Sequence, residues 1–193
     1  MTSKIKILAF SGSLRADSAN YKLLAVAAEG ARKANAEVTV VSLREFPMPI
    51  YNQEIEDAEG LPPEAKRFKE LLTQHHGFLI ASPEYNSSIS GALKNAIDWA
   101  SRPEDGDKGM VAFAGKVAGL LAASPGALGG LRGLVHLRSI LGNIQTLVIP
   151  EQYALSNAFQ AFAADGSMVD AKAAEKAKSI AHRLVEVTGR LQG

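Results

Sequence analysis

Hydroxyl-bearing side chains and one arginine gather in FSGSLRADSAN, residues 10–20, directly after a short apolar run. A hydroxyl-rich turn that leads into a helix is a good site for an anion such as a phosphate group. Backbone N–H groups and the helix dipole favour negative charge there, and hydroxyls and arginine donate hydrogen bonds to its oxygens. Serine and asparagine are also common turn and cap residues, so this turn alone predicts either a phosphate site or a simple cap.

A second polar turn lies at the start of SPEYNSSISGALKNAIDW, residues 82–99. Pro83 restricts the backbone, and Tyr85 offers an aromatic face beside a site for a planar ring. Asn86 and nearby backbone amides are suited to bind ring carbonyls and nitrogens. The alternative for Tyr85 is a packed surface aromatic. For Trp99 we prefer a place in the core or at an interface.

A third turn, SPGALGGLRG at residues 124–133, contains four glycines. Glycine lets a backbone approach a flat ligand or another chain closely, and it also permits the positive φ of a tight strand-to-helix turn. Both explanations are compatible with this segment.

Several other chemistries are excluded by composition. The chain has no cysteine, so disulfides, thiolate metal sites and a cysteine nucleophile are absent, and redox chemistry requires a bound cofactor. The four histidines lack the spacing of a metal-ligand pair, and FSGSL lacks the G-x-S-x-G spacing of a serine hydrolase. The 21 Lys and Arg are offset by 20 Asp and Glu, which argues against a nucleic-acid partner.

Five apolar or β-branched runs predict strands, and helical spacing or caps predict helices between them. We expect strands at 4–10, 37–43, 77–82, 116–124 and 144–150, the last ended by Pro150. Helices are expected at about 18–35, from Pro62-Pro63 onward, at 88–101, at about 129–141, and after an Asp170 cap. Segments 44–63 and 102–115 read as loops, with the acidic side chains of Glu54, Glu56, Asp57 and Glu59 solvated.

This alternation predicts one α/β domain over residues 1–193, a three-layer α/β/α sandwich with a five-stranded parallel sheet. The three polar turns follow the first, third and fourth strands. Ligands of such sheets bind beyond the carboxyl ends of the strands, so the three turns are expected to meet there.

The quoted segments SGSLRADSAN and SPEYNSSISGALKNAIDWASRP, with the 124–130 turn, resemble the signatures of the NAD(P)H-dependent FMN reductase family. That family includes quinone, azo-dye and chromate reductases and has the flavodoxin-like fold. The resemblance implies an FMN phosphate at Ser11, Ser13, Arg15, Ser18 and Asn20. It also implies that Pro83, Glu84, Tyr85 and Asn86 line the flavin ring, and that Ser124 with Gly126 and Gly129 closes the other side.

The resemblance further implies a homodimer or homotetramer, with contact faces on the helix at 90–101 and the helix after Gly130. We therefore expect an oxidoreductase that passes electrons from NAD(P)H through FMN to a small-molecule acceptor, by ping-pong turnover and without a side-chain base. The acceptor could be a quinone, free flavin, an azo compound or a metal oxyanion such as chromate. Two alternatives remain open, a flavodoxin-type electron carrier and a non-catalytic flavin-binding interaction protein. The sequence shows neither a signal peptide nor an apolar run long enough for a bilayer, so we expect a cytoplasmic protein without a membrane partner.

Overall fold

A computed structural model describes residues 4–192. Its main sheet has five parallel strands in the order β2-β1-β3-β6-β7. The strands are β1 (Lys6–Ser11), β2 (Glu37–Ser42), β3 (Gly77–Ala81), β6 (Val117–Ala123) and β7 (Leu147–Leu155). This is the doubly wound strand order of flavodoxin-like proteins, and it confirms the predicted fold class.

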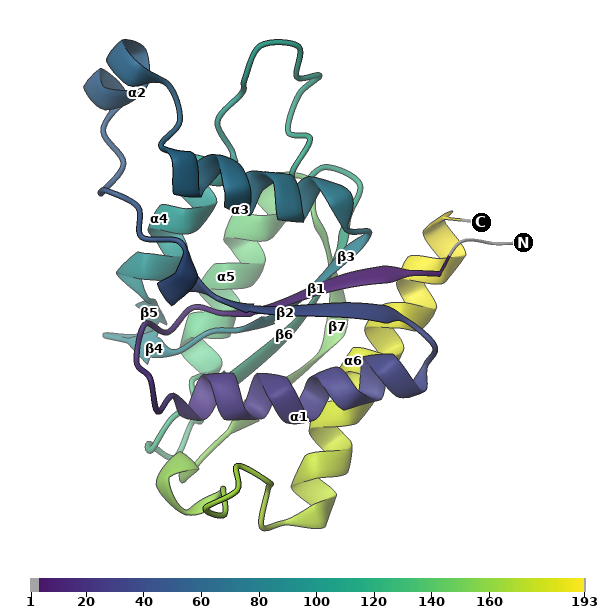
Figure 1. The fold of residues 1–193 in the computed structure, drawn as a ribbon. Helices are drawn as coiled ribbons and strands as arrows, with labels where there is room; N and C mark the ends of the chain where they lie inside the picture. Colours follow the sequence, from purple (N-terminus) through teal and green to yellow (C-terminus); the bar gives the residue numbers. More distant parts are fainter. Residues whose placement is uncertain (1–3, 193) are drawn as a thin grey trace.

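Helices cover both faces of the sheet (Figure 1). One face carries α1 (Ala19–Lys33) and α6 (Ala171–Gln192), and the other carries α3 (Pro63–Gln74), α4 (Gly91–Ala100) and α5 (Leu131–Asn143). The central strands β3 and β6 are buried along their whole length, as their continuous apolar sequences predict. Because the five strands are parallel, their carboxyl ends lie at one edge of the sheet, where the following loops can form a site.

The predicted helix starts are confirmed by their caps. The Ser18 side chain accepts a hydrogen bond from the Tyr21 N–H at the start of α1. The Asp170 carboxylate accepts from the Lys172 N–H at 2.8 Å before α6. Both contacts satisfy N–H groups that have no partner within the helix itself.

Pro150 does not end the last strand, contrary to the prediction. β7 continues to Leu155, and Pro150 lies where its pairing with β6 shifts register, since Val148 pairs with Ala118 but Gln152 pairs with Leu120. β7 is an edge strand, where the missing proline N–H removes no central ladder bond. An irregularity on an edge strand thus accommodates a residue that would break a central one.

One predicted loop and one predicted helix also differ from the structure. Segment 44–63 was expected to be a loop, but it begins within a 3-10 turn, Leu43–Glu45, and contains α2 (Gln53–Glu59). The predicted helix at 88–101 begins only at Gly91, because β4 (Glu84–Tyr85) and β5 (Ser88–Ile89) form a short antiparallel hairpin before it. A second 3-10 turn, Ala158–Gln160, follows β7.

Within residues 4–192, none of the helices is both long enough and apolar enough to cross a membrane.

Candidate active site

Parts of all three predicted ligand turns surround one cavity of about 190 Å³ at the carboxyl edge of the sheet. Eight of the twelve predicted site residues line it, namely Ser13, Arg15, Ser18, Asn20, Pro83, Glu84, Tyr85 and Ser124. Ser11, Asn86, Gly126 and Gly129 belong to the same turns but are not among the lining residues. The sequence therefore predicted which segments converge, although not every side chain at the cavity wall.

The first turn holds its serine hydroxyls in a buried row before α1. Ser11 Oγ accepts from the Ser13 N–H, Ser13 Oγ from the Arg15 N–H, and Ser18 Oγ from the Tyr21 N–H, each at 3.3 Å. A hydroxyl that accepts one N–H still has its own O–H proton to donate. The Arg15 side chain is exposed at the cavity mouth. Hydroxyl donors, a guanidinium and a helix N-terminus form a donor set suited to a phosphate group.

Asn20 contacts the end of β6, directly before the third turn, as well as facing the cavity. Its Nδ2 donates to the Ala123 carbonyl and its Oδ1 accepts from the Ala123 N–H, both at 2.8 Å. Ala123 is the last residue of β6, two residues beyond Leu121, the last β6 residue that pairs with β3. The Asn20 amide thus takes the place of the missing strand next to the end of β6.

The second turn is the β4–β5 hairpin. Asn86 and Ser87, its two loop residues, have positive φ values of 50° and 67°. Two central residues with positive φ are typical of a type I′ hairpin turn. Tyr85 is 51% exposed and lies at the cavity, so its ring is available to a ligand.

Glu84 directs its carboxylate to α5. Its Oε1 accepts from Arg132 Nε at 3.0 Å and Nη2 at 2.7 Å, and its Oε2 accepts from the Gly133 N–H at 3.0 Å. Burial would raise the pKa of Glu84, but the hydrogen bonds from Gly133 and Arg132 outweigh it, so the pKa lies below its ordinary value. Glu84 is therefore a carboxylate anion at neutral pH.

The glycines of the third turn are explained by packing. Gly129 and Gly130 have φ values of 62° and 93°. A Cβ on Gly129 would lie 2.7 Å from the Leu155 carbonyl carbon, and one on Gly130 would lie 2.7 Å from Ala122 Cβ. Both therefore meet the requirement for a tight strand-to-helix turn, the second of the two explanations drawn from the sequence.

Ser90 joins the first turn to the second, which the sequence did not indicate. Its Oγ donates to the Gly12 carbonyl at 2.5 Å and accepts from the Leu93 N–H at the start of α4. With Asn20 between the first and third turns and Glu84 between the second and third, one side chain connects each pair of turns.

Sequence reasoning also missed the segment after β7. Phe159 and Phe162 line the cavity, and Phe159 is 78% exposed. Lys22, paired with Asp17, adds a cation near the first turn. Phe159 and Phe162 carried no motif, because their place depends on where β7 ends beside β6.

A larger groove of about 810 Å³ lies on the other side of the first turn, between α4 and the segment from Leu43 to Tyr51. Its wall is mainly apolar and includes Leu14, Met48 and the strongly exposed Ile50. Trp99 does not line it. The Trp99 ring is fully buried below, with its Nε1 donating to the Pro49 carbonyl, which confirms the structural role expected for it.

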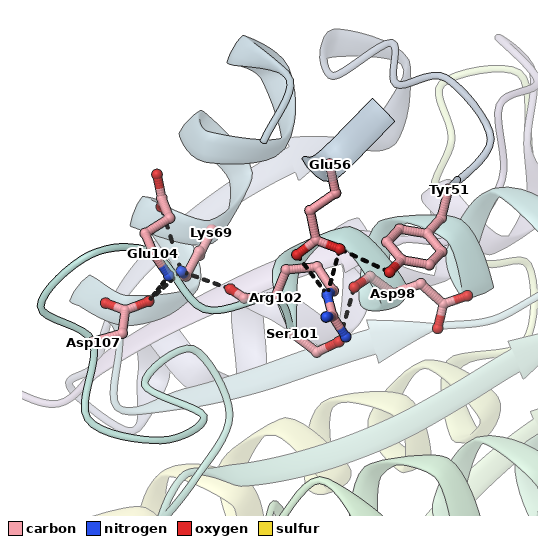
Figure 2. A network of polar contacts seen from close by, with 8 residues as sticks. All are labelled: Tyr51, Glu56, Lys69, Asp98, Ser101, Arg102, Glu104 and Asp107. Carbon is pink, nitrogen blue, oxygen red and sulfur yellow. Dashed lines mark hydrogen bonds and ion pairs between the residues drawn. The ribbon is translucent and has the colours of Figure 1, made fainter. Parts of the chain in front are cut away.

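A polar network extends from Tyr51, one of the groove residues, to Asp107 (Figure 2). Arg102 Nε donates to both Glu56 oxygens at 2.9 and 3.0 Å, and Tyr51 Oη donates to Glu56 Oε2 at 2.8 Å. The buried Lys69 Nζ donates to the Arg102 carbonyl and pairs with Asp107. Glu56 was expected to be solvated, but its side chain is only 13% exposed, because Arg102 and Tyr51 satisfy it. The network fixes α2 and the 102–107 loop to α3 and α4.

The sequence of the chain is similar to those of known proteins. Residues 5–160 match the family model described as NADPH-dependent FMN reductase. An NAD(P)H-dependent FMN reductase of Pseudomonas aeruginosa is 38% identical over 100% of both chains. An NADPH:quinone oxidoreductase of Arabidopsis thaliana is 34% identical over 98% of this chain and 94% of its own.

A solved structure shows the same similarity in three dimensions. The flavoenzyme NAD(P)H:(acceptor) oxidoreductase FerB of Paracoccus denitrificans aligns with a TM-score of 0.80 and 31% identity, over 96% of this chain and 98% of its own. The chain belongs to the NADPH-dependent FMN reductase family, a family of oxidoreductases that use FMN with NAD(P)H as the electron donor.

Proposed function

We propose that this chain is an NAD(P)H-dependent FMN oxidoreductase that binds the FMN phosphate in the 190 Å³ cavity and reduces a quinone-type acceptor. The observation that carries the proposal is the convergence of the hydroxyl-rich first turn, the Tyr85 hairpin and the Ser124 turn on that cavity. A phosphate end and an aromatic end at one cavity suit a ligand that has both, as FMN does.

The residues of the first turn hold the phosphate. Ser13 and Ser18, which line the cavity, use their free O–H protons as donors, and Arg15 adds a charge-assisted bond. Ser11 supports them from below, because its Oγ accepts from the Ser13 N–H. The Asn20 side chain keeps Ala123 in place, so its contribution is to the shape of the cavity as well as to any direct contact.

The second and third turns position the ring. Pro83 and Tyr85 supply one wall, and Ser124 with the backbone of the following glycines supplies the other. Bound FMN supplies the two-electron transfer between NAD(P)H and the acceptor. Backbone N–H groups around Tyr85 and the Asn86 amide orient the ring and stabilise negative charge near its pyrimidine edge. No side chain in this scheme has to act as a general base.

The acceptor is proposed from the relatives. Curated relatives from rice, Arabidopsis, potato and Escherichia coli are named quinone oxidoreductases or quinone reductases. Free flavin, azo compounds and chromate differ from a quinone in size and charge, so their reduction requires a site that accepts such different molecules. Reduction rates measured with a panel of these acceptors test this directly.

We also propose that the chain forms a homodimer or homotetramer through α4 and α5. Ile50, at the apolar groove beside α4, is 85% exposed, and Val135 on α5 is 59% exposed. Analytical ultracentrifugation of the full chain tests this, with Ile50→Asp expected to weaken association. A wild-type chain that sediments as a monomer at all concentrations contradicts it.

The activity itself is tested with FMN-loaded protein. Oxidation of NADPH and of NADH is followed by the loss of their near-ultraviolet absorption, with a benzoquinone as acceptor, and about 1–1,000 turnovers per second is the ordinary range for an enzyme. Acceptor-dependent oxidation of either nucleotide supports the proposal. Bound FMN without such oxidation contradicts it and indicates a flavodoxin-type carrier, and partner binding without turnover indicates an interaction protein.

A further inference from the structure

The β4–β5 hairpin is too short to be stable by itself. Each strand has only two residues, paired as Glu84 with Ile89 and Tyr85 with Ser88. Isolated hairpins are marginal in water even when longer. Ser87 also has a φ of 67°, a left-handed conformation that disfavours residues with a Cβ. Contacts from elsewhere must therefore hold the hairpin in this conformation.

Those contacts come from one face of α5. Arg132 and the Gly133 N–H bind the Glu84 carboxylate, as described above. One turn further along α5, His136 Nδ1 lies 3.0 Å from Ser88 Oγ. A side chain four residues beyond another lies on the same helix face. One face of α5 therefore contacts both strands of the hairpin, β4 through Glu84 and β5 through Ser88.

The backbones of α5 and the hairpin are also very close. A Cβ on Gly133 would lie 3.2 Å from the Ser88 carbonyl oxygen and 3.4 Å from Glu84 Cβ. The absence of a side chain at Gly133 allows Glu84 to reach the first turn of α5. There its negative charge is favoured by the helix dipole and by the free N–H groups.

The burial of Glu84 suits it to hold the hairpin in position on α5, and not to contact a ligand through its carboxylate. The side chain is 8% exposed, while its partner Arg132 is 58% exposed. Both carboxylate oxygens are engaged by α5. The contribution of Glu84 is therefore to hold the backbone that carries Tyr85, which lines the cavity.

We propose that Glu84 is a positioning residue that, through Arg132 and the Gly133 N–H, fixes the hairpin to α5 and so holds the second and third ligand turns, the two walls of the ring site, in one preorganised arrangement. This inference rests on the proposed function, because these two walls are the ones assigned to the flavin ring. α5 begins directly after Gly130 of the third turn. Movement of the hairpin relative to α5 would change the distance between Tyr85 and Ser124. A wall that is already ordered binds a flat ring more tightly, because less ordering free energy is lost on binding.

The test compares Arg132→Ala and Glu84→Gln with wild type and with Arg67→Ala. Arg67 pairs with Glu64 within α3, so the control removes an arginine of similar exposure whose ion pair does not reach the hairpin. Three quantities are measured on the full chain. They are the FMN dissociation constant from quenching of flavin fluorescence, the visible absorption spectrum of bound FMN, and hydrogen exchange of amides 85–89 in the absence of FMN.

Arg132→Ala is expected to weaken FMN binding roughly tenfold, which corresponds to about 1.4 kcal/mol. Glu84→Gln should change FMN affinity in the same direction, and the loss in the double variant should be smaller than the sum of the two single losses, because both changes break the Glu84–Arg132 contact. The visible spectrum of bound FMN should shift, and exchange at 85–89 should accelerate in both variants. Arg67→Ala should change none of these.

An unchanged FMN affinity and spectrum in both variants overturns the inference, as does unchanged exchange at 85–89. A fall in thermal stability that is equal with and without FMN, at constant affinity, also overturns it, since that is a purely structural role. If Arg132→Ala fails to fold, Glu84→Gln decides. If wild type does not bind FMN, the proposed function fails, while exchange at 85–89 still reports on the contact itself.

Discussion

Replacing Asn20 with alanine removes the side chain that satisfies the end of β6. β3 stops at Ala81, and the Ser82 N–H donates to the Leu121 carbonyl at 2.8 Å as the last backbone contact along that side. Two residues on, the Ala123 N–H and carbonyl face the same side and bond to the Asn20 amide at 2.8 Å each. The substitution leaves both groups without a protein partner.

The magnitude follows from the burial of these groups. Asn20 and Ala123 are each 5% exposed. An unsatisfied buried polar group costs about 1–3 kcal/mol. Because Ala123 also borders the cavity, water can partly replace the lost amide, and we expect Asn20→Ala to lower the free energy of unfolding by about 2–3 kcal/mol.

Equilibrium urea unfolding of the chain without FMN measures this loss. Asn143→Ala, at the exposed end of α5, serves as a matched control and should change stability by less than about 0.5 kcal/mol. Asn20→Asp should also destabilise the fold, because it keeps an acceptor for the Ala123 N–H but places a second oxygen against the Ala123 carbonyl. A loss below about 0.5 kcal/mol for Asn20→Ala would refute the reasoning.

Two further substitutions test other parts of the fold. Gly30→Ala places a Cβ 2.1 Å from the Lys178 carbonyl oxygen where α1 crosses α6, and it should lower the unfolding free energy by about 1–3 kcal/mol. Gly142→Ala, where a Cβ meets nothing within 4 Å, should leave the thermal midpoint unchanged or slightly raised, and equal effects at the two sites would contradict the packing argument. Burial holds the pKa of His75 below its ordinary value of 6.5, so the folded state disfavours the protonated ring. The stabilising contribution of the neutral ring should therefore be fully present above that value and decline as the pH falls below it, and His75→Gln should flatten this dependence of the unfolding free energy on pH in urea titrations.

Much of the fold followed from local sequence. Continuous apolar runs at β3 and β6 indicated buried parallel strands, and Ser18 and Asp170 indicated helix starts that the structure confirms. These features depend on residues close together in the chain, which is why a single sequence reveals them.

The failures all depend on distant partners. Pro150 fits within β7 only because β7 is an edge strand with a register shift. α2 contains Glu56, whose carboxylate is satisfied by Arg102 from another part of the chain. The hairpin at Asn86-Ser87 is held by α5, and Glu84 faces Arg132 across 48 positions of sequence. No local pattern predicts such pairings.

The candidate site likewise has parts that local sequence predicts and parts that depend on distant contacts. The three turns were found from their residue types and from their places after strands 1, 3 and 4. The side chains that connect the turns, Ser90, Asn20 and Glu84, revealed their contacts only in three dimensions. Phe159 and Phe162, which also line the cavity, had no sequence signal at all.

The central claim is that the first turn binds the phosphate of FMN, and a comparison of FMN with riboflavin, which lacks that phosphate, tests it most directly. Wild type should bind FMN at least about tenfold more tightly than riboflavin in fluorescence titrations, because only FMN can accept from the serine hydroxyls and Arg15. Arg15→Ala should reduce that preference and leave riboflavin affinity nearly unchanged. Equal affinity of the wild-type chain for FMN and riboflavin would contradict the account.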